Sequence, residues 1–477
     1  MIKNWLSRYN LHYPRSLVYM LQASEYNIRD YLTWYHKTKN FSRVERRKKF
    51  VKTAKGLLLL MMGWAIVFVL IGLSVSILWI DTTPFKYIFL LAIVFLLPYF
   101  LAYGLVVPLL IIKIMIQLPV EYLIINRARQ KLKAHNAIKI GIAGSFGKTT
   151  MREILKTVLS EGKKVAAPPH SYNTLLGISQ FIKTLKGDEE ILVFELGEYY
   201  PSNVRKLCDL VQPSMGVITG VNEAHLQKFK SLERTVKTIY ELADYLGKRP
   251  VYVNGENDLA RKNTRSGHIV YDRRRVGNWK IENPKTDLTG TSFILTRNGT
   301  KLELKSALLG LHQIGPLAAS AEIALNLGLS FDQVKDGISK TMPFDHRLEP
   351  KTDNAGVITL DDSYNGNPDG VKAVIAFLAS LKDCRRFYVT PGLVEMGART
   401  KEVHEQIGRS LARASIEKVI LIKNSVTQYI EEGLKEEKYQ GEILWYNDAL
   451  TAFASLPHLT VKGDVVLLQN DWPDQYQ

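Results

Sequence analysis

The segment from Ile138 to Leu155, IKIGIAGSFGKTTMREIL, restricts the fold more than any other part of the chain. It begins as an apolar run that is typical of a strand, and it ends with the apolar spacing of a helix. Between the two lie glycines and a cluster of polar residues, namely Gly141, Gly144, Gly147, Lys148, Thr149 and Thr150. The segment therefore predicts a strand, a phosphate-binding loop and a helix.

Phosphate chemistry accounts for the residue types at this junction. Glycines let the backbone turn so that its N–H groups point inward, and the helix N-terminus adds partial positive charge. Lys148 would reach the outer phosphates, and a threonine hydroxyl would hold Mg²⁺. The alternative is a glycine-rich turn with an exposed lysine. The strict nucleotide-loop spacing needs glycine where Ile142 stands, so this loop is a variant.

Composition places the chain among globular proteins of a reducing compartment. Its 477 residues are 46% apolar and 23% charged, which is enough for about two or three domains with buried cores. Cys208 and Cys384 are the only cysteines and lie far apart in the sequence. Neither a disulfide framework nor a cysteine metal site is therefore expected.

The net charge of +17 raises the alternative of nucleic-acid binding, but the excess is unevenly distributed. Nine lysines and arginines lie between Lys37 and Lys55 against the single acid Glu45, directly before a long apolar run. Cationic residues beside a membrane-spanning segment explain this pattern more simply. We expect a lipid bilayer as a partner and no nucleic acid.

Two apolar runs predict a transmembrane hairpin. The first, residues 57–80, carries no charge and exceeds the roughly 20 residues that a spanning helix needs. The second, residues 87–112, is also uncharged, and Pro98, Gly104 and Pro108 are expected to kink it. The first run starts well inside the chain and lacks a small-residue cleavage pattern, so a removable signal peptide is not expected.

Basic residues flank both outer ends of the hairpin, whereas the connecting turn has only Asp81 and Lys86. The positive-inside rule then places both termini and the phosphate loop in the cytoplasm, with the chain in the plasma membrane as a multi-pass protein. Residues 1–36 are rich in tyrosine and tryptophan and predict an interfacial or cytosolic helical segment, to which no role is assigned.

From about Pro119 the pattern becomes α/β. Strand-like runs at 191–194, 215–219 and 251–253 alternate with helical stretches, which predicts a largely parallel sheet covered on both faces. Shorter alternating strands follow Arg273. A second α/β alternation begins after the segment MPFDHRLEP. The expected domains are a basic and aromatic segment (1–56), the hairpin (57–118), a first α/β domain that holds the phosphate loop (119–344) and a second α/β domain (345–477).

Polar residues that follow strands are candidates for chemistry, because open α/β sheets bind ligands at the carboxyl ends of their strands. Glu195 ends the run ILVFE and could be a Mg²⁺ ligand or a solvated acid. His225, in a loop after the next strand, could be a second metal ligand. In the second α/β part, Asp362 belongs to LDDSYNGNP, which suits ribose or phosphate contacts or a simple turn. Arg347 is a candidate charge clamp.

Seven motifs in order resemble the Mur ligases. They are GIAGSFGKTT, FELGE, NEAHLQKF, GLHQIGPLAASAEIA, DHRLEP, DDSYNGNPDG and LVEMGARTKEVHEQIG. The resemblance covers residues 135–477, and it is strongest to the branch that adds D-alanyl-D-alanine in cell-wall (peptidoglycan) synthesis. It implies that residues 119–344 are a central ATP-binding domain with a P-loop and that residues 345–477 are a Rossmann-like C-terminal domain. It also implies an ATP-dependent ligase that transfers the γ-phosphoryl group to a substrate carboxylate. An amine then attacks the acyl phosphate to give an amide, ADP and phosphate.

The resemblance also implies roles for individual residues. Mg²⁺ would be bound by Thr149, Glu195 and His225. Lys148, His225 and Lys237 would be catalytic, with Lys237 matching the family's carbamoylated lysine if one residue is gapped. The nucleotide would be contacted by Gly144, Ser145, Gly147, Lys148, Thr149, Thr150, His312, Arg347, Asp362 and Asn365.

Several positions depart from the family pattern. Phe146 stands where the family usually has Asn or Ser, and Gln313 and Pro316 replace asparagines, the latter one that contacts adenine. The base pocket is therefore expected to differ. The ending LLQNDWPDQY lacks the usual basic motif that helps to hold the incoming amine. A muramyl peptide or similar carboxylate and an amino acid or dipeptide amine are the expected substrates.

The N-terminus departs most, because soluble Mur ligases carry there a small domain that grips the UDP of their substrate. A membrane hairpin in its place predicts a lipid-linked or membrane-proximal acceptor, or recognition of UDP without a dedicated domain. The alternative is that the hairpin is only an anchor. Two other functions stay open: a poly-γ-glutamate or folylpolyglutamate type of amide ligase, and a catalytically inactive ATP-binding membrane assembly protein.

Overall fold

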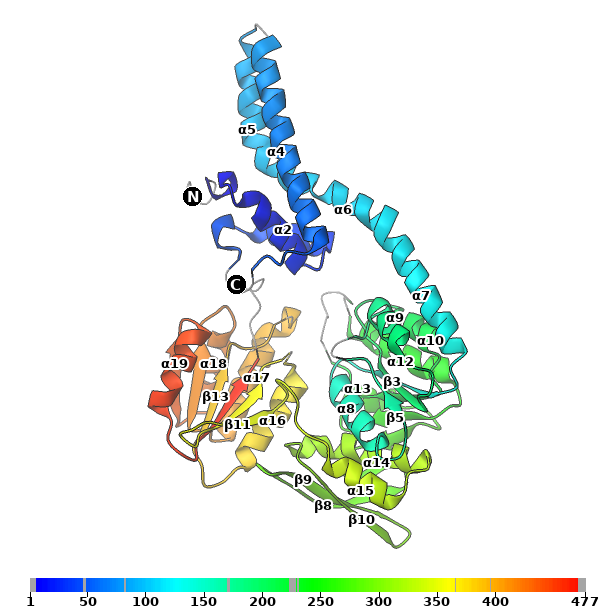
Figure 1. Ribbon diagram of the computed structural model, residues 1–477. Coiled ribbons are helices and arrows are strands. Elements are labelled where there is room, and N and C mark those ends of the chain that lie inside the picture. The colour runs from blue at the N-terminus through cyan, green and yellow to red at the C-terminus, as the bar shows by residue number, and fades with distance from the viewer. Residues whose placement is uncertain are drawn as a thin grey trace. The chain divides into compact units, whose positions relative to one another are not determined.

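The computed structural model describes residues 6–45, 49–80, 83–169, 172–222, 229, 231–364, 366–394 and 396–470. The chain divides into two compact units, of which the first ends at Leu123 and the second begins at Ile124 (Figure 1). The finer domain limits expected from the sequence stay predictions.

The first unit contains a pair of long apolar helices, α4 (Ala54–Ile80) and α5 (Phe85–Gly104). Pro98 lies inside α5, and the chain turns at Leu105 before α6 (Val106–Ile112), a π-helical turn (Lys113–Gln117) and α7 (Leu118–Lys133). Both apolar segments are long and apolar enough to cross a membrane. The predicted hairpin helices are therefore present.

The first residues of the chain pack against this hairpin. They form a short 3-10 turn (Ser7–Tyr9), α2 (Tyr13–Ala23), α3 (Ile28–Lys37) and a second turn (Phe41–Arg43). Tyr13 and Tyr31 are buried in the same core as Leu101 and Ala102 of α5. The Tyr13 hydroxyl donates to the Pro98 carbonyl at 3.1 Å, and the Tyr31 hydroxyl donates to the Ala102 carbonyl at 2.9 Å. Both bonds attach the N-terminal helices to backbone carbonyls of α5.

The second unit contains a ten-stranded sheet with the order β10-β9-β8-β7-β6-β5-β4-β1-β3-β2. Its parallel part comprises β1 (Ile138–Ala143), β2 (Val165–Ala166), β3 (Ile191–Glu195), β4 (Met215–Ile218), β5 (Val251–Asn254) and β6 (Ile269–Tyr271). An antiparallel extension follows, formed by β7 (Arg275–Val276), β8 (Trp279–Asp287), β9 (Gly290–Arg297) and β10 (Thr300–Ser306).

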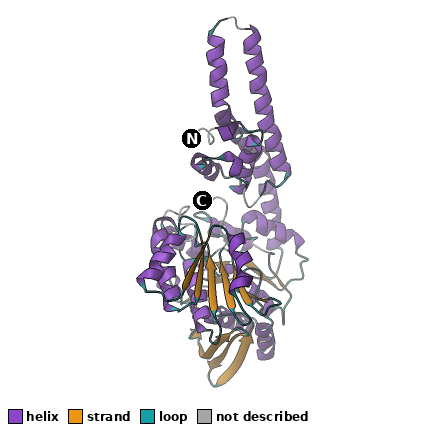
Figure 2. Ribbon diagram, turned by 90° about the vertical axis from the view of Figure 1, so that its left-hand side faces the viewer, coloured by secondary structure: helices purple, strands orange, loops and turns teal. Residues whose placement is uncertain are grey.

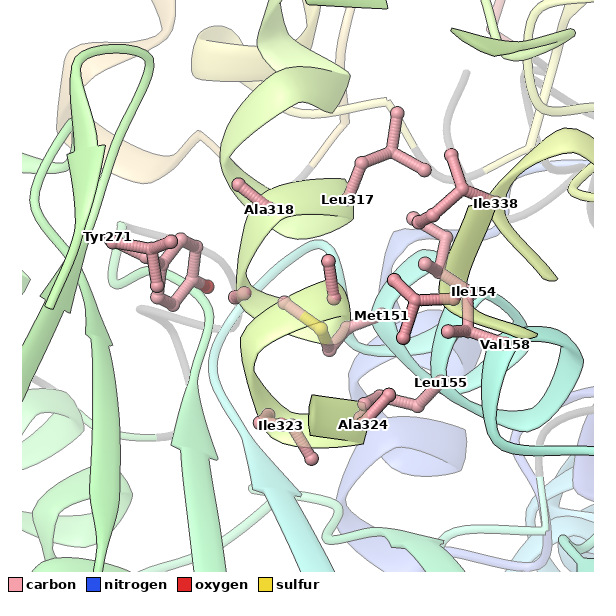
Figure 3. Packing of buried hydrophobic residues seen from close by; sticks show 14 of the residues in the cluster. Met151, Ile154, Leu155, Val158, Tyr271, Leu317, Ala318, Ile323, Ala324 and Ile338 are labelled. Atoms are coloured by element: carbon pink, nitrogen blue, oxygen red, sulfur yellow. The ribbon is translucent and has the colours of Figure 1, made fainter. Parts of the chain in front are cut away.

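Helices cover both faces of this sheet, as the sequence predicts. One face carries α8 (Lys148–Leu159), α14 (Ile314–Asn326) and α15 (Phe331–Ser339). Figure 3 shows Met151, Ile154 and Leu155 of α8 packed against α14. The other face carries the end of α7, α9 (Leu175–Thr184), α10 (Asn203–Val211), α12 (Leu232–Leu246) and α13 (Asp258–Lys262). These two cores fix β1 and α8, and with them the loop that joins them.

A second sheet has the order β11-β12-β16-β13-β14-β15. Its strands are β11 (Glu349–Thr352), β12 (Ile358–Asp362), β13 (Arg386–Thr390), β14 (Lys418–Ile422), β15 (Glu442–Tyr446) and β16 (Val465–Gln469), and only β11 is antiparallel to its neighbour. One face carries α16 (Pro368–Ser380), α17 (Thr400–Arg413) and α18 (Thr427–Glu436), and the other carries α19 (Ala449–Leu459). Figure 2 shows strands flanked by helices. The predicted α/β class is thus confirmed.

Helices α17 and α18 approach each other through glycines. A Cβ atom on Gly408 would lie 2.1 Å from the Ile430 carbonyl oxygen, and one on Gly433 would lie 2.1 Å from the Glu405 carbonyl oxygen. Any side chain at either position would separate the two helices, so the close packing on this face depends on glycine.

Glu322 of α14 has a buried carboxyl group whose effect on the free energy of unfolding depends on pH. Its side chain lies in the core, and among the described residues its Oε2 atom has no hydrogen-bond partner. Burial raises the pKa of Glu322 to about 7, against a weaker opposing effect of Arg297. Between its pKa values in the unfolded and the folded chain, Glu322 keeps its proton in the folded state but loses it in the unfolded chain, where its pKa is lower. Stability therefore falls as the pH rises from about 4.5 to 7.

We expect Glu322→Gln to stabilise the full chain by about 2 to 3 kcal/mol at pH 8 and to have little effect at pH 4.5. The amide fills the same space without the charge that burial penalises. Thermal unfolding of the full chain in detergent at both pH values measures this difference. The exposed Glu303 on β10 provides the control substitution Glu303→Gln. Equal stabilisation at both pH values would contradict the pH-dependent cause.

Candidate active site

The loop between β1 and α8 has a backbone that requires glycine. Gly144 has φ 150° and Gly147 has φ 76°. A Cβ atom on Gly144 would lie 2.2 Å from the Thr219 Oγ1 atom. The Ser145 N–H donates to the Gly220 carbonyl at 2.7 Å, so the loop is fastened to the end of β4. The sequence thus folds here into a tight cradle at the start of a helix of 12 residues.

Phe146, which departs from the family pattern, fills space above Gly220. A Cβ atom on Gly220 would lie 2.4 Å from the Phe146 ring, and the Thr219 hydroxyl donates to the Phe146 carbonyl. The aromatic ring therefore needs glycine on the neighbouring loop. Phe146 thus packs on the loop after β4, and the Lys148 and Thr149 that follow it are retained.

Lys148 is engaged by a residue that the sequence analysis did not select. Its Nζ atom donates to both carboxylate oxygens of Glu198 at 2.9 Å, and also to the Gly144 carbonyl. Glu198 lies just after β3 and is 4% exposed. The available signal was a second acid three residues beyond Glu195 in the motif ELGE.

Glu195 ends β3 beside the first turn of α8. The Thr149 hydroxyl donates to its Oε2 atom at 3.1 Å, and Arg152 lies 2.8 Å from its Oε1 atom. Burial raises the pKa of Glu195, while the Arg152 and Lys148 cations oppose this change. Arg152 was also missed by the sequence analysis, although its spacing of three residues from Thr149 places both on one helix face.

The structure brings Lys148, Thr149 and Glu195 together, and Ser145 and Thr150 belong to the same loop and first helical turn. The described residues include no group of three or more His, Cys, Asp or Glu residues arranged to hold a metal ion. His225 and Asn365 lie outside the described residues. Lys237 is exposed on α12, and its carbamoylation stays a prediction.

Arg347 and Asp362 form a second charged group. The Arg347 guanidinium lies 5.0 Å from the centre of the Tyr364 ring. Burial lowers the pKa of Arg347, while Asp362, Tyr364 and Glu195 oppose this effect.

Burial raises the pKa of Asp362 to about 6, against the effects of a hydrogen bond from Gln469 and of the Arg347 cation. The Gln469 amide donates to the Asp362 Oδ2 atom at 2.7 Å. Asp361, its neighbour, instead lies 2.8 Å from His346. Adjacent residues of a strand point to opposite faces, so the two aspartates have different partners.

A further contact joins loops of the two sheets, because the Asn222 amide donates to the Asn367 side-chain oxygen at 3.1 Å. His312 lies in the 3-10 turn Leu311–Gln313 before α14, and its Nε2 atom lies 3.0 Å from the Gln313 amide nitrogen. Burial lowers the pKa of His312 to about 4, and the Arg273 cation adds to this effect. His312 is therefore neutral at pH 7, where it can accept or donate a single hydrogen bond at each ring nitrogen.

The donor set fits a phosphate group. The cradle combines backbone N–H groups at a helix N-terminus with a lysine, and the Ser145 hydroxyl is buried without a hydrogen-bond partner among the described residues. Thr149 and Glu195 supply oxygens of the kind that Mg²⁺ prefers. Fold and cradle together define an α/β protein of the phosphate-loop nucleotide-binding class.

Comparisons with known proteins narrow this class. The Mur ligase middle domain model matches residues 142–324, and the model described as Mur ligase, glutamate ligase domain matches residues 346–469. This chain belongs to the Mur ligase family.

Similar proteins carry a consistent name. The UDP-N-acetylmuramoyl-tripeptide–D-alanyl-D-alanine ligase of Mycobacterium bovis is 29% identical over 294 residues, which cover 59% of this chain and 58% of that protein. The Escherichia coli ligase of the same name is 25% identical and is covered to 64%. The crystal structure of MurF ligase from Thermotoga maritima in complex with ADP has a TM-score of 0.66 and 25% identity, covering 74% of this chain and 80% of that one. The chain thus spans about three-fifths of the length of the first relative.

Proposed function

We propose that the chain is an ATP- and Mg²⁺-dependent ligase that forms an amide bond through an acyl phosphate. The observation that carries this proposal is the grouping of Lys148, Thr149 and Glu195 at one end of the parallel sheet. The buried hydroxyl of Ser145 supports a phosphate in the cradle. Similarity to a ligase crystallised with ADP supports the choice of nucleotide.

The residues of the chain then have distinct tasks. The loop N–H groups and Lys148 neutralise the outer phosphates. Arg347, which lies just before the first strand of the second sheet, adds positive charge. Thr149 and Glu195 would hold Mg²⁺, with His225 as a further ligand. When bound, the cation would neutralise charge that develops on the transferred phosphoryl group.

The proposed ligase reaction has two steps. A carboxylate oxygen of the acid substrate attacks the γ-phosphorus, and the bond to the β,γ-bridging oxygen breaks to release ADP. The amine then attacks the acyl carbon, phosphate leaves, and the amine loses a proton to solvent. Positioning and charge neutralisation provide most of the catalysis of phosphoryl transfer, which agrees with a site built from a loop, a lysine and a carboxylate.

For the substrates, we propose a muramyl-peptide carboxylate and D-alanyl-D-alanine or a similar amine. The names of the relatives support this pair. The matched region begins at residue 142, and the two long apolar helices precede it. We therefore propose a plasma-membrane protein with a cytoplasmic catalytic unit and an acceptor that is lipid-linked or held near the membrane.

The test of the ligase activity follows phosphate release by the purified full chain with ATP, Mg²⁺ and pairs of acid and amine. We expect release that needs both a muramyl tripeptide and D-alanyl-D-alanine, with a stoichiometric amide product. Release with glutamate and a glutamyl or folyl acid instead would identify the other type of amide ligase. No release with any pair would favour an ATP-binding assembly protein.

The membrane proposal has its own test. The full chain in lipid vesicles is supplied with the same tripeptide linked either to UDP or to a polyprenyl lipid. We expect faster turnover of the lipid-linked acceptor, and we expect the soluble unit beginning at Ile124 to lose this preference. Equal turnover of the UDP-linked acceptor by both proteins would leave the hairpin as an anchor only.

A further inference from the structure

Glu198 and Lys148 form a buried ion pair at the place where the proposed function needs a free lysine. Their side chains are 4% and 12% exposed, respectively, and both carboxylate oxygens lie 2.9 Å from the ammonium nitrogen. The third donor of the ammonium group goes to the Gly144 carbonyl. All three N–H donors of the lysine are therefore directed to the protein itself.

A phosphate entering the cradle competes for these donors. If the Lys148 ammonium group turned to the phosphate, the Glu198 carboxylate would stay buried but would lose hydrogen bonds from Lys148. It would also have a second anion, the phosphate, beside it. Arg152, the other buried cation of the site, is already held by Glu195 and Glu153. A buried carboxylate without a partner is strongly unfavourable, and a neighbouring phosphate of the same sign makes it more so.

A divalent cation removes this conflict. It carries two positive charges and accepts carboxylate and phosphate oxygens together, directly or through its water molecules. Glu195 and Thr149, the proposed Mg²⁺ ligands, lie on the same strand end and helix turn as Glu198 and Lys148. A cation arriving with the triphosphate would thus compensate Glu198 at the moment when Lys148 is withdrawn.

We propose that Glu198 makes nucleotide binding conditional on a divalent cation. Without the cation, Glu198 holds Lys148 and opposes binding of a free triphosphate. With the cation, the positive charge would compensate the Glu198 carboxylate, and Lys148 would be free to contact the phosphates. Glu198 is thus a specificity-determining residue that selects the metal-complexed triphosphate over free polyphosphate anions. This inference rests on the proposed nucleotide site.

The experiment measures ATP binding by the full chain in detergent, using calorimetry with Mg²⁺ or with excess EDTA. For the natural chain we expect metal-free ATP to bind at least about tenfold more weakly than Mg²⁺–ATP. In Glu198→Gln we expect metal-free ATP to bind about tenfold more tightly than in the natural chain, whereas Mg²⁺–ATP gains nothing. The dependence on Mg²⁺ should therefore shrink in this variant.

Glu161→Gln is the matched control, because it removes the same unit charge at the far end of α8 from the cradle. Glu161 follows the last turn of that helix and pairs with Lys340. In this control, the ATP affinity should depend on Mg²⁺ as strongly as it does in the natural chain. Glu198→Asp provides a second variant that keeps the charge but shortens its reach, and it should fall between the natural chain and Glu198→Gln. Near-ultraviolet circular dichroism verifies the fold of each protein.

The outcomes separate the two proposals. If the natural chain binds ATP neither with nor without Mg²⁺, the proposed nucleotide function fails. If it binds both forms with equal affinity, or if Glu198→Gln keeps the full dependence on Mg²⁺, the role of Glu198 is overturned while the nucleotide function stands. Equal loss of both affinities in Glu198→Gln would make Glu198 a structural partner of Lys148 and would also overturn the role.

Discussion

Replacement of Lys148 by alanine is expected to lower ATP-dependent phosphate release by roughly 10²- to 10³-fold or more while the proposed insertion of the hairpin into the membrane is unaffected. The ammonium group is the cation at the start of α8, directly after the glycines of the cradle. Its removal leaves the outer phosphates with the backbone N–H groups but without their neutralising charge. Single-turnover kinetics with saturating substrates measure the loss in the chemical step.

Because Lys148 is paired with Glu198, Lys148→Ala is expected to change stability as well as turnover, and a second substitution at Glu198 separates the two effects. Lys148→Ala leaves a carboxylate that is 4% exposed without its cation, so some loss of stability is expected. The double variant Lys148→Ala, Glu198→Gln removes the orphaned charge and should regain stability without regaining turnover. Lys156→Ala, on the exposed side of the same helix, should leave turnover unchanged. Normal turnover in Lys148→Ala would remove the assigned phosphate contact.

Local signals were sufficient for the central strand, loop and helix. The alternating apolar residues predict a strand from Ile138, and the structure has β1 at Ile138–Ala143. Gly144 and Gly147 both have the positive φ that glycine adopts without strain. Glu195 could also be placed at a strand end from the local sequence, because a continuous apolar run precedes it and ends at this acid.

Contacts between distant segments could not be predicted in this way. Glu198 is 50 residues from Lys148, and the hydrogen bond between Tyr31 and Ala102 spans 71 residues. Such partners depend on the order of strands in the sheet or on the packing of helices, which residue spacing does not encode. The tyrosines of the first 36 residues therefore predicted helices but not the hairpin carbonyls that they contact.

Short strands were predicted after Arg273, but the bounds of β8 could not be predicted, for a local reason. Its sequence, WKIENPKTD, contains proline and mostly exposed polar residues, which are unfavourable signals for a strand. The structure accommodates them with an irregular register between Glu282 and Lys285, where Asn283 has φ 52°. A bulge of this kind removes the alternation by which a strand is predicted, although β8 lies between β7 and β9 in the sheet.

Replacement of Arg152 by methionine is expected to lower the free energy of unfolding by about 3 to 5 kcal/mol at pH 8. Arg152 and Glu195 are each 3% exposed, and the Arg152 guanidinium lies 2.8 Å from the Glu195 carboxylate. Methionine keeps much of the side-chain volume but leaves the carboxylate in a buried place with only the Thr149 hydroxyl and the Lys148 charge to compensate it.

The pH dependence of this loss identifies its cause. Burial already raises the pKa of Glu195, and removal of Arg152 takes away the largest opposing effect. A carboxyl with a raised pKa in the folded state costs no stability below its unfolded pKa, and the cost grows as the pH rises through that value. Arg152→Met should therefore be much less destabilised at pH 4.5 than at pH 8, as measured by the urea midpoint of the full chain.

The double variant Arg152→Met, Glu195→Gln completes the cycle. If the buried charge is the cause, the second substitution should regain most of the stability at pH 8 and little at pH 4.5, because the protonated acid and the amide are then alike. Glu153, the other partner of Arg152, has a side chain that is 32% exposed, so water can replace its lost contact. Equal destabilisation at both pH values, or a double variant no more stable than Arg152→Met, would instead attribute the loss to packing around α8. In that case Glu195 would be held at the end of β3 without help from the arginine.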